Sequence, residues 1–317
     1  MTRVTVLLGG LSNEREVSLS SGREIAAALR EGGFEVTTLD PGPDLGALVS
    51  AITASRPDAV FNALHGRFGE DGCIQGVLDW MGIPYTHSGL RASAVAMDKA
   101  AAKAAFAAAG LPVAPHRLLE AKALAAADPF PLPYVVKPVR EGSSVGVHIL
   151  RTGDNRRAEI AAGWCWGEII AEPFIPGREL TVAVMEDRAL AVTEIATGHE
   201  FYDYDAKYAD GGSRHVIPAA VPDAVRDRAM DVAVRAHAAL GCRGVSRSDF
   251  RWDDSLPGAD GLILLEVNTQ PGMTPTSLVP EQAAYRGIPF PELCAWMVRQ
   301  ARHDGMVQGV KGMRDAA

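Results

Sequence analysis

A loop of small residues preceded by a lysine is the first candidate for phosphate chemistry. The segment from Lys137 to Gly146 reads Lys-Pro-Val-Arg-Glu-Gly-Ser-Ser-Val-Gly. Small residues let backbone N–H groups turn inward around phosphate oxygens, and a lysine supplies a point charge. This is not a P-loop, because its lysine precedes the glycines and the following run favours a strand. The pattern indicates a β-hairpin that folds over a nucleotide, and a plain hairpin turn is the alternative.

Acidic and amide side chains on two neighbouring predicted strands form a second group. Glu266 and Asn268 lie two residues apart, so the period of a strand puts both on one face. Arg247 and Asp249 share that spacing on the preceding strand. If the strands pair, three oxygen donors of the kind that Mg²⁺ prefers converge. Arg247 beside them could hold a transferring phosphate, and a solvated strand face with an ion pair is the alternative.

The segment from Glu172 to Glu179 (Glu-Pro-Phe-Ile-Pro-Gly-Arg-Glu) connects two predicted strands. Its backbone and apolar groups could hold an adenine, with Glu179 reaching a ribose hydroxyl. A tight strand connection without any ligand is the alternative for this weak signal.

Acids, a lysine and tyrosines gather in the segment from Phe201 to Tyr208 (Phe-Tyr-Asp-Tyr-Asp-Ala-Lys-Tyr). No periodicity runs through the surrounding stretch between Gly198 and Val216, so no regular element is expected there. Such a segment suggests a mobile lid that closes over substrate and excludes water. A merely solvated loop is the alternative.

Glu14 follows the first predicted strand, and His65 follows the third. An acid and a histidine at the same sheet edge could anchor an amino group and a carboxylate. A dinucleotide site is the rival interpretation, but Gly9 and Gly10 do not complete the G-x-G-x-x-G fingerprint.

The elements that must position these residues begin with a βαβ pattern. Strands are expected at Val4–Leu8, Phe34–Leu39 and Asp58–Leu64, with a helix at Ser20–Arg30. This alternation predicts a parallel sheet, whose carboxyl edge gathers ligands. The first domain is therefore an open α/β module that ends near residue 95.

The remaining chain predicts mainly strands. Alanine-rich Met97–Ala109 predicts a helix that stops at Gly110, and a further helix is expected at Asp223–Leu240. Strands are expected at Tyr134–Lys137, Val145–Leu150, Glu168–Glu172, Leu180–Met185, Leu190–Ile195, Gly244–Trp252 and Leu262–Asn268.

Composition excludes several classes of protein. The 317 residues carry a formal charge of −8, which disfavours nucleic acid as a partner. The four cysteines lie far apart without a C-x-x-C pair, so free thiols in a reducing compartment are expected. No apolar run approaches the roughly 20 residues that span a bilayer, and the amino terminus favours a strand over a signal peptide. A cytoplasmic protein without membrane contact is expected.

Taken in order, these motifs resemble those of the ATP-grasp enzymes, and among them the D-alanine–D-alanine ligases. The resemblance runs from Val4 to about Val298 and rests on six segments. They are Leu7–Ser18, Ala63–Gly72, Met97–Lys99, Val136–Gly146, Phe201–Tyr208 and Leu265–Thr274.

The resemblance implies an α/β ATP-grasp fold, α+β in its centre, with three domains. These are an amino-terminal open parallel α/β domain (1–95), a central domain with the glycine-serine loop (96–180) and a carboxyl-terminal catalytic domain (181–317). It implies ATP-dependent joining of two D-alanines through a D-alanyl phosphate, for peptidoglycan precursors. It further implies two Mg²⁺ (or Mn²⁺) ions and a homodimer in the cytoplasm.

The resemblance also assigns roles position by position. For ATP it implies Lys99, Lys137, Ser144, Glu172, Ile175, Glu179 and Lys207, and for the metal ions Asp249, Glu266 and Asn268. For D-alanine it implies His65, Ser277 and Leu278. For the reaction centre it implies Glu14, Ser143, Tyr208, Arg247 and Gly272, where Arg247 and the Gly272 N–H would stabilise the oxyanion.

Departures from the family pattern are few. Pro173 stands where relatives often carry lysine, so one nucleotide contact is lost. Gln270, Pro275 and Thr276 differ from some relatives near the second substrate. Tyr208 matches the members that form dipeptides rather than D-lactate depsipeptides, which favours D-alanine as second substrate. Another carboxylate–amine ligase, a D-alanine–D-lactate variant and a non-catalytic nucleotide-binding module are the alternatives.

Overall fold

The computed structural model describes residues 1–197 and 213–305. The chain divides into two units, each assembled from separate stretches of sequence. The first unit comprises Met1–Ala94, Cys242–Val245 and Gly272–Ala317, and the second comprises Val95–Gly241 and Ser246–Pro271.

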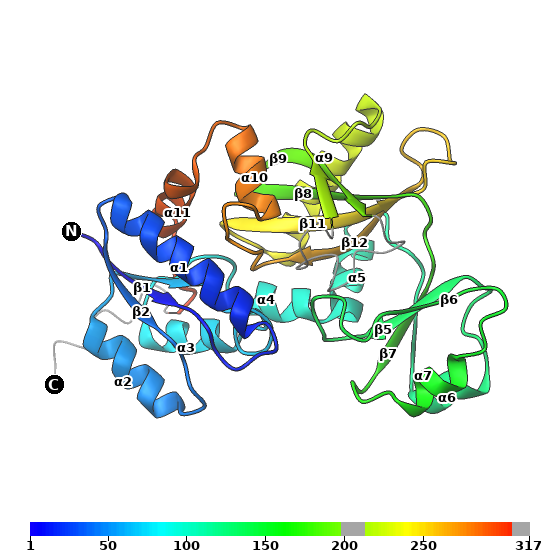
Figure 1. Ribbon diagram of the computed structural model, residues 1–317, viewed down its shortest axis with the longest axis horizontal. Coiled ribbons are helices and arrows are strands. Elements are labelled where there is room, and N and C mark those ends of the chain that lie inside the picture. The colour runs from blue at the N-terminus through cyan, green and yellow to red at the C-terminus, as the bar shows by residue number, and fades with distance from the viewer. Residues whose placement is uncertain (198–212, 306–317) are drawn as a thin grey trace. The chain divides into compact units, whose positions relative to one another are not determined.

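The first unit contains a parallel sheet in the order β2-β1-β3, of which Figure 1 labels β1 and β2. Its strands are β1 (Arg3–Leu7), β2 (Glu35–Leu39) and β3 (Ala59–Asn62). The predicted βαβ pattern is confirmed, although helix α1 (Arg15–Glu31) begins at Arg15 rather than Ser20. Polar residues before the first buried position of α1 concealed this early start.

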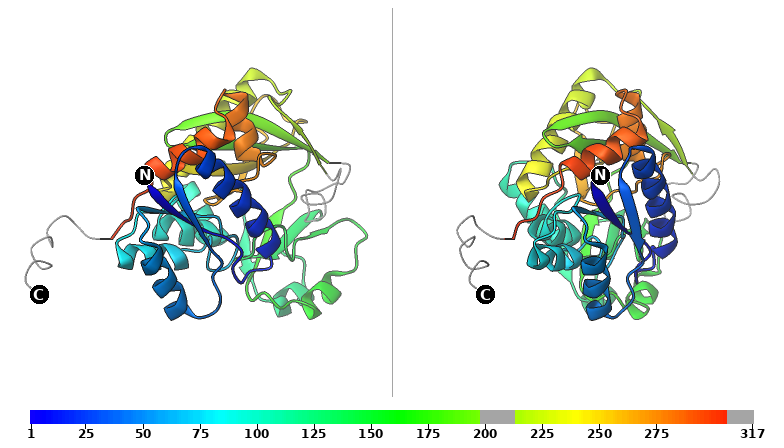
Figure 2. Two further views of the ribbon diagram at one scale, coloured as in Figure 1. Left: turned by 60° about the vertical axis from the view of Figure 1, so that its left-hand side comes forward. Right: turned by 90° about the vertical axis from the view of Figure 1, so that its left-hand side faces the viewer.

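Helices cover the sheet of the first unit. They are α1, α2 (Leu45–Ser55), α3 (Cys73–Met81) and α11 (Phe290–Arg299), and α10 (Leu278–Tyr285) packs against α11. Ile52 of α2 and Leu78 of α3 share a core with Leu7 and Val60 of the sheet. Helix α11 packs along α1, as both views of Figure 2 show. Helix α4 (Leu90–Met97) contains the division between the units.

The second unit contains an antiparallel sheet in the order β4-β7-β5-β6. Its strands are β4 (Arg117–Leu119), β5 (Tyr134–Pro138), β6 (His148–Leu150) and β7 (Ile169–Pro173). Helices α6 (Ala121–Ala126) and α7 (Arg157–Ala162) cover it, with Leu124 and Ile160 packed against Tyr134. The predicted hairpin is confirmed by the pairing of β5 with β6.

A second antiparallel sheet of this unit has the order β10-β9-β8-β11-β12. Its strands are β8 (Arg178–Met185), β9 (Arg188–Thr197), β10 (Ser213–Val216), β11 (Val245–Trp252) and β12 (Leu262–Asn268). Helices α5 (Lys99–Ala108) and α9 (Asp223–Leu240) pack on it, and α9 has the predicted bounds. The expectation of no regular element between Gly198 and Val216 is wrong for the last four residues, because β10 pairs with β9.

The structure also bears on the cysteines and on membrane-spanning helices. All four cysteines are free thiols, as expected. Within residues 1–197 and 213–305, every helix is either too short or too polar to cross a bilayer.

Candidate functional site

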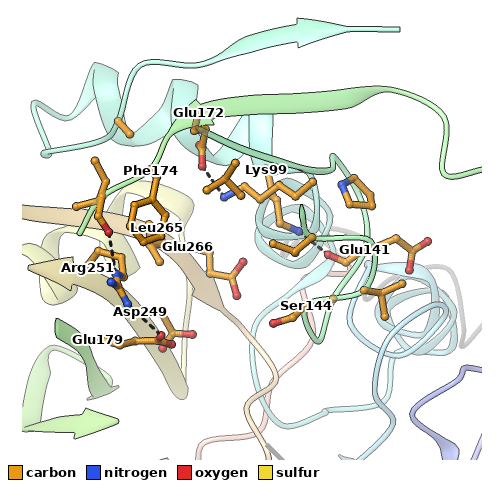
Figure 3. A pocket seen from close by; sticks show the side chains of 18 of the residues that line it. Lys99, Glu141, Ser144, Glu172, Phe174, Glu179, Asp249, Arg251, Leu265 and Glu266 are labelled. Carbon is orange, nitrogen blue, oxygen red and sulfur yellow. Dashed lines mark hydrogen bonds and ion pairs between the residues drawn. The ribbon is translucent and has the colours of Figure 1, made fainter. Parts of the chain in front are cut away.

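A cavity in the second unit gathers most residues that the sequence assigns to ATP (Figure 3). Helix α5, the β5–β6 hairpin, the β7–β8 connection and strands β11 and β12 all contribute to its lining. The predicted residues that it brings together are Lys99, Lys137, Ser143, Ser144, Glu172, Ile175, Glu179, Asp249 and Glu266. Cations, small loop residues and carboxylates therefore surround one space.

A buried ion-pair cluster fixes one of the cavity lysines. Lys137 Nζ lies 2.6 Å from Glu172 Oε2, and the ammonium of Lys103 contacts Oε1 of the same carboxylate. Val135 of β5 stands opposite Glu172 of β7, which brings Lys137 within reach. Lys103 is only 2% exposed. The sequence did not indicate this role of Lys103, because a lysine in an alanine-rich helix usually faces solvent.

The two lysines keep the buried carboxylate ionised. Burial alone would raise the pKa of Glu172, but the charges and hydrogen bonds of Lys137 and Lys103 lower that pKa to about 2. Burial lowers the pKa of Lys103, and the charge of Glu172 acts against this. The Glu172 carboxylate and the two lysines therefore stay charged only while they remain together.

Lys99 approaches the cavity from the first turn of α5. The Asp98 side chain caps this helix by accepting from the Ala101 N–H (3.0 Å). The Lys99 N–H donates to the Val139 carbonyl (3.0 Å), and its ammonium donates to the Glu141 carbonyl. Burial lowers the pKa of Lys99, with the charge of Glu266 raising it and that of Lys137 lowering it. The cationic side chains of Lys99 and Lys137 therefore line the same cavity.

The loop between β5 and β6 has an unusual backbone. Ser143 (φ 47°) and Ser144 (φ 60°) both adopt the left-handed conformation, which costs free energy for residues with a Cβ. Gly146 (φ 67°) packs so closely that a Cβ there would lie 2.9 Å from Pro138 Cγ. Strained residues of this kind cluster at functional sites, which supports the interpretation of the loop as a phosphate cover.

The predicted pairing of the acidic strands is confirmed. Asp249 stands opposite Glu266, and Arg247 stands opposite Asn268, in the β11–β12 register. The Arg247 guanidinium donates to both Asp249 oxygens (2.8 and 2.6 Å). Asn268 Oδ1 accepts from the Gln270 N–H (2.7 Å).

This donor set fits a hard cation. Asp249 and Glu266 are adjacent carboxylates that both line the cavity, and an amide oxygen follows on the same strand. In the described part of the chain, no group of three or more histidine, cysteine or acidic side chains is placed to hold a metal ion, and the present set combines two acids with one amide. A carboxylate has lone pairs for more than one partner, so Asp249 can accept from Arg247 and still offer an oxygen.

The β7–β8 connection, residues 174–177, forms the other end of the cavity and is called the hinge segment below. Phe174, Ile175 and Glu179 line the cavity here, and Figure 3 labels Phe174 and Glu179. Arg251 of β11 contacts the hinge segment and lies 3.8 Å from Glu179 Oε2. The sequence did not indicate this role of Arg251, because nothing in its local pattern points to a partner 76 residues away in the chain.

The residues assigned to the amino-acid substrates belong to the first unit. His65 is buried, and its Nδ1 lies 2.9 Å from Glu70 Oε1. A Cβ on Gly66 would lie 3.0 Å from Glu14 Oε2, so the Glu14 carboxylate lies beside the residue that follows His65.

Three further assigned residues lie in the β12–α10 connection and at the first position of α10, in the first unit. Ser277 Oγ accepts from the Thr274 N–H (3.1 Å) and lies 2.8 Å from Thr274 Oγ1. Leu278 is buried, and a Cβ on Gly272 would lie 3.1 Å from Ser277 Oγ. The two remaining assigned residues, Lys207 and Tyr208, lie outside the described residues, as does the lid predicted at 201–208.

Comparison with known proteins identifies related sequences along most of the chain. The family model "D-ala D-ala ligase C-terminus" matches residues 105–299, and "D-ala D-ala ligase N-terminus" matches residues 44–88. The D-alanine–D-alanine ligase of Acidiphilium cryptum is 68% identical and covers 95% of this chain and 99% of that protein. That of Gluconobacter oxydans is 64% identical over 94% of this chain and 99% of that protein.

Solved structures give the same result. The D-alanine–D-alanine ligase of Bacillus anthracis superposes with a TM-score of 0.80 at 30% identity. Its complex with ATP superposes with a TM-score of 0.79 at 27% identity, and both cover 95% of this chain and 97% of that one. These likenesses confirm the ATP-grasp fold expected from the sequence. Since the C-terminal family model spans 105–299 and relatives above 60% identity match nearly end to end, the chain belongs to the D-alanine–D-alanine ligase family.

Proposed function

We propose that this chain joins two molecules of D-alanine into D-alanyl-D-alanine at the expense of ATP, for peptidoglycan precursors. One observation carries the proposal beyond family membership. Lys99 and Lys137 face the same cavity as Asp249 and Glu266. A nucleotide triphosphate needs cations for its phosphates and hard oxygen donors for its metal ions, and this cavity offers both.

ATP takes the cavity of the second unit. Lys99, Lys137, Ser144 and Lys207 bind its phosphates, and the strained serine loop covers them. Ile175 binds the base through its main chain, and Glu179 accepts from the ribose. Glu172 contributes to the base end through its main chain, because two lysines engage its carboxylate.

Asp249, Glu266 and Asn268 hold two Mg²⁺ (or Mn²⁺) ions. When bound, these ions neutralise charge on the phosphate groups. Arg247 stands next to this set and already holds Asp249 in place. Its guanidinium donates in a fixed fork that suits an anionic group. We therefore assign Arg247, together with the Gly272 N–H, to the oxyanion of the tetrahedral intermediate.

The amino-acid substrates use the first-unit residues. Glu14 takes the ammonium of the first D-alanine, and His65 lies near its carboxylate. Ser277 and Leu278 bind the carboxylate of the second D-alanine. Ser143 and Tyr208 complete a hydrogen-bonded set with Glu14 at the reaction centre.

The reaction follows from the weakness of a carboxylate as an electrophile. The carboxylate of the first D-alanine attacks the γ-phosphorus of ATP, releasing ADP and forming D-alanyl phosphate. The deprotonated amine of the second D-alanine then attacks the acyl carbon, and phosphate leaves with the C–O bonding pair. Water would hydrolyse the acyl phosphate, which gives the lid at 201–208 its function.

The remaining properties complete the proposal. The chain has three domains (1–95, 96–180 and 181–317), acts in the cytoplasm and forms a homodimer through the amino-terminal domain. Light scattering of the purified protein tests the oligomeric state, and a monomeric mass at working concentration would contradict the dimer.

The proposed activity is tested by phosphate release with ATP and Mg²⁺, followed by mass analysis of products. Reactions with D-alanine, L-alanine, and D-alanine plus D-lactate are compared. Release that requires D-alanine and yields its dipeptide is expected. A depsipeptide would indicate a D-lactate ligase, and no stimulation by D-alanine would leave another acid and amine as substrates.

A further inference from the structure

The hinge segment is held by one buried arginine from another strand. Arg251 Nε donates to the Ile175 carbonyl (3.1 Å), and Nη2 donates to the Gly177 carbonyl (2.8 Å). Its guanidinium carbon lies 5.6 Å from the centre of the Phe174 ring. Arg251 is 9% exposed, so these contacts are made largely out of solvent. One side chain therefore spans the hinge segment from Phe174 to Gly177.

The same guanidinium reaches the carboxylate that follows the hinge segment. Arg251 Nη1 lies 3.8 Å from Glu179 Oε2, and Figure 3 shows Arg251 between the hinge segment and Glu179. Both residues line the cavity. Arg251 thus fixes a main-chain segment and a carboxylate at the same end of the site.

Two neighbouring contacts also press the hinge segment onto the end of β11. Gly177 (φ 89°) leaves no room for a Cβ, which would lie 2.1 Å from the Trp252 carbonyl oxygen. Arg178 stacks over the Trp252 ring at 5.3 Å and pairs with Glu194. Arg178, Trp252 and Glu194 stay outside the cavity lining, whereas Arg251 is part of it. Arg251 is therefore placed to determine the position of the hinge segment next to the cavity.

We propose that Arg251 is a positioning residue for the base and ribose of the nucleotide. It holds the Ile175 main chain and the Glu179 carboxylate in the geometry that binds them before the nucleotide arrives. This inference rests on the proposed function, in that ATP occupies this cavity. Because the segment is ordered in advance, binding does not have to order it, and affinity rises.

Arginine suits this task better than lysine. Its planar guanidinium donates from two edges in fixed directions, so it can bind two carbonyls at once. A lysine ammonium is a point donor on a flexible stem and cannot hold both carbonyls in one plane. An Arg251→Lys variant should therefore retain only part of the nucleotide affinity that Arg251 contributes, and Arg251→Met should retain none of that contribution.

The test compares Arg251→Met and Arg251→Lys with the wild type in the full-length chain. Arg228→Lys serves as the control, since Arg228 is exposed on α9 and pairs with Asp231 of the same helix. Three readouts are taken: ADP affinity with Mg²⁺ by calorimetry, steady-state kinetics, and hydrogen exchange at residues 174–178. Calorimetry requires no ligase activity.

For Arg251→Met we expect about tenfold weaker ADP binding and about tenfold higher KM for ATP, with kcat within about threefold. The KM for D-alanine stays unchanged, and exchange at residues 174–178 speeds up in the nucleotide-free protein. Arg251→Lys falls between, and Arg228→Lys matches the wild type.

ADP affinity within about twofold of the wild type in Arg251→Met would overturn the inference. So would an equal deterioration of kcat and of the KM values for both substrates, because that indicates general damage to the fold. Wild-type protein that binds ADP without D-alanine-dependent phosphate release defeats the proposed function alone, since the ADP comparison still decides the role of Arg251. Wild-type protein that binds no ADP defeats both.

Discussion

Lys137 Nζ lies 2.6 Å from Glu172 Oε2. A lysine of β5 that we assign to the phosphates of ATP is therefore held by a carboxylate of the neighbouring strand β7. Lys103 supplies the second positive charge and is almost completely buried. A buried carboxylate between two lysines is stable only as a set, because loss of one member leaves an uncompensated charge out of water. Glu172 therefore has a structural and a positioning role together.

Replacing Glu172 with glutamine should destabilise the protein and weaken ATP binding. The buried Lys103 then loses its counter-charge, which we expect to cost about 3 kcal/mol of the free energy of unfolding. Urea unfolding measures this loss. The double variant Lys103→Met, Glu172→Gln should be more stable than Glu172→Gln alone, because it removes the orphaned charge. A single variant within about 0.5 kcal/mol of the wild type would contradict the coupling.

Glu266 should prove more important for the metal than for the fold. We expect Glu266→Gln to lower kcat by about 100-fold and to raise the Mg²⁺ concentration for half-maximal rate by about tenfold, because a charged oxygen donor is lost. Mg²⁺ titrations of phosphate release, and of ADP binding by calorimetry, measure both effects. Asp260→Asn, in the exposed β11–β12 connection, is the matched control. Equal Mg²⁺ dependence in both variants would remove Glu266 from the metal set.

Local rules explain what the sequence predicts well. The two-residue period of a strand puts Glu266 and Asn268 on one face, and pairing of consecutive strands brings Asp249 opposite Glu266. The shift of register between Asp249 and Phe250 follows this pair and leaves it intact. A short connection between neighbouring strands thus allowed the acidic pair to be predicted without the structure.

Contacts between distant parts of the chain explain what was missed. Arg243 donates to the carbonyl of His87 (3.1 Å), a residue 156 positions earlier in the chain. It also pairs with Asp304, near the carboxyl terminus. Arg251 likewise contacts the hinge segment, and Lys103 contacts Glu172, across long separations in the chain. Each of these residues has an ordinary local pattern, so its burial depends on tertiary packing that periodicity does not encode.

His87 should make the protein less stable in mild acid. It is 4% exposed, and its Nε2 has no hydrogen-bond partner among the described residues. Burial, with a smaller contribution from His65, lowers the pKa of His87 to about 3. The unfolded chain binds a proton near pH 6.5 that the folded chain does not, so stability falls as pH falls from about 6.5 towards 3.

We expect His87 to account for roughly 2 kcal/mol of lost stability between about pH 6.5 and pH 5, at about 1.36 kcal/mol per pH unit. His87→Asn removes the titrating group and tolerates the left-handed backbone at this position (φ 69°). Urea unfolding at several pH values should therefore give a shallower pH dependence for this variant, even if it is less stable at neutral pH. Parallel curves for the two proteins would exclude His87 as the cause.

Gly177 should tolerate no side chain, although another glycine with a similar backbone should. Gly177→Ala places a Cβ 2.1 Å from the Trp252 carbonyl oxygen at φ 89°, so the hinge segment must move away from β11. A Cβ on Gly258 (φ 55°) would meet no atom within 4 Å, so Gly258→Ala bears only the backbone strain of about 1 kcal/mol. Comparing the two variants separates the steric clash from the strain.

We expect Gly177→Ala to lose at least about 2 kcal/mol more stability than Gly258→Ala, measured by urea unfolding. It should also bind ADP more weakly, because displacement of the hinge segment breaks the Arg251 contact with the Gly177 carbonyl. Gly258 lies in the exposed β11–β12 connection, so its variant should bind ADP as the wild type does. Equal ADP affinity in both variants would mean that the base end of the cavity does not depend on where the hinge segment lies.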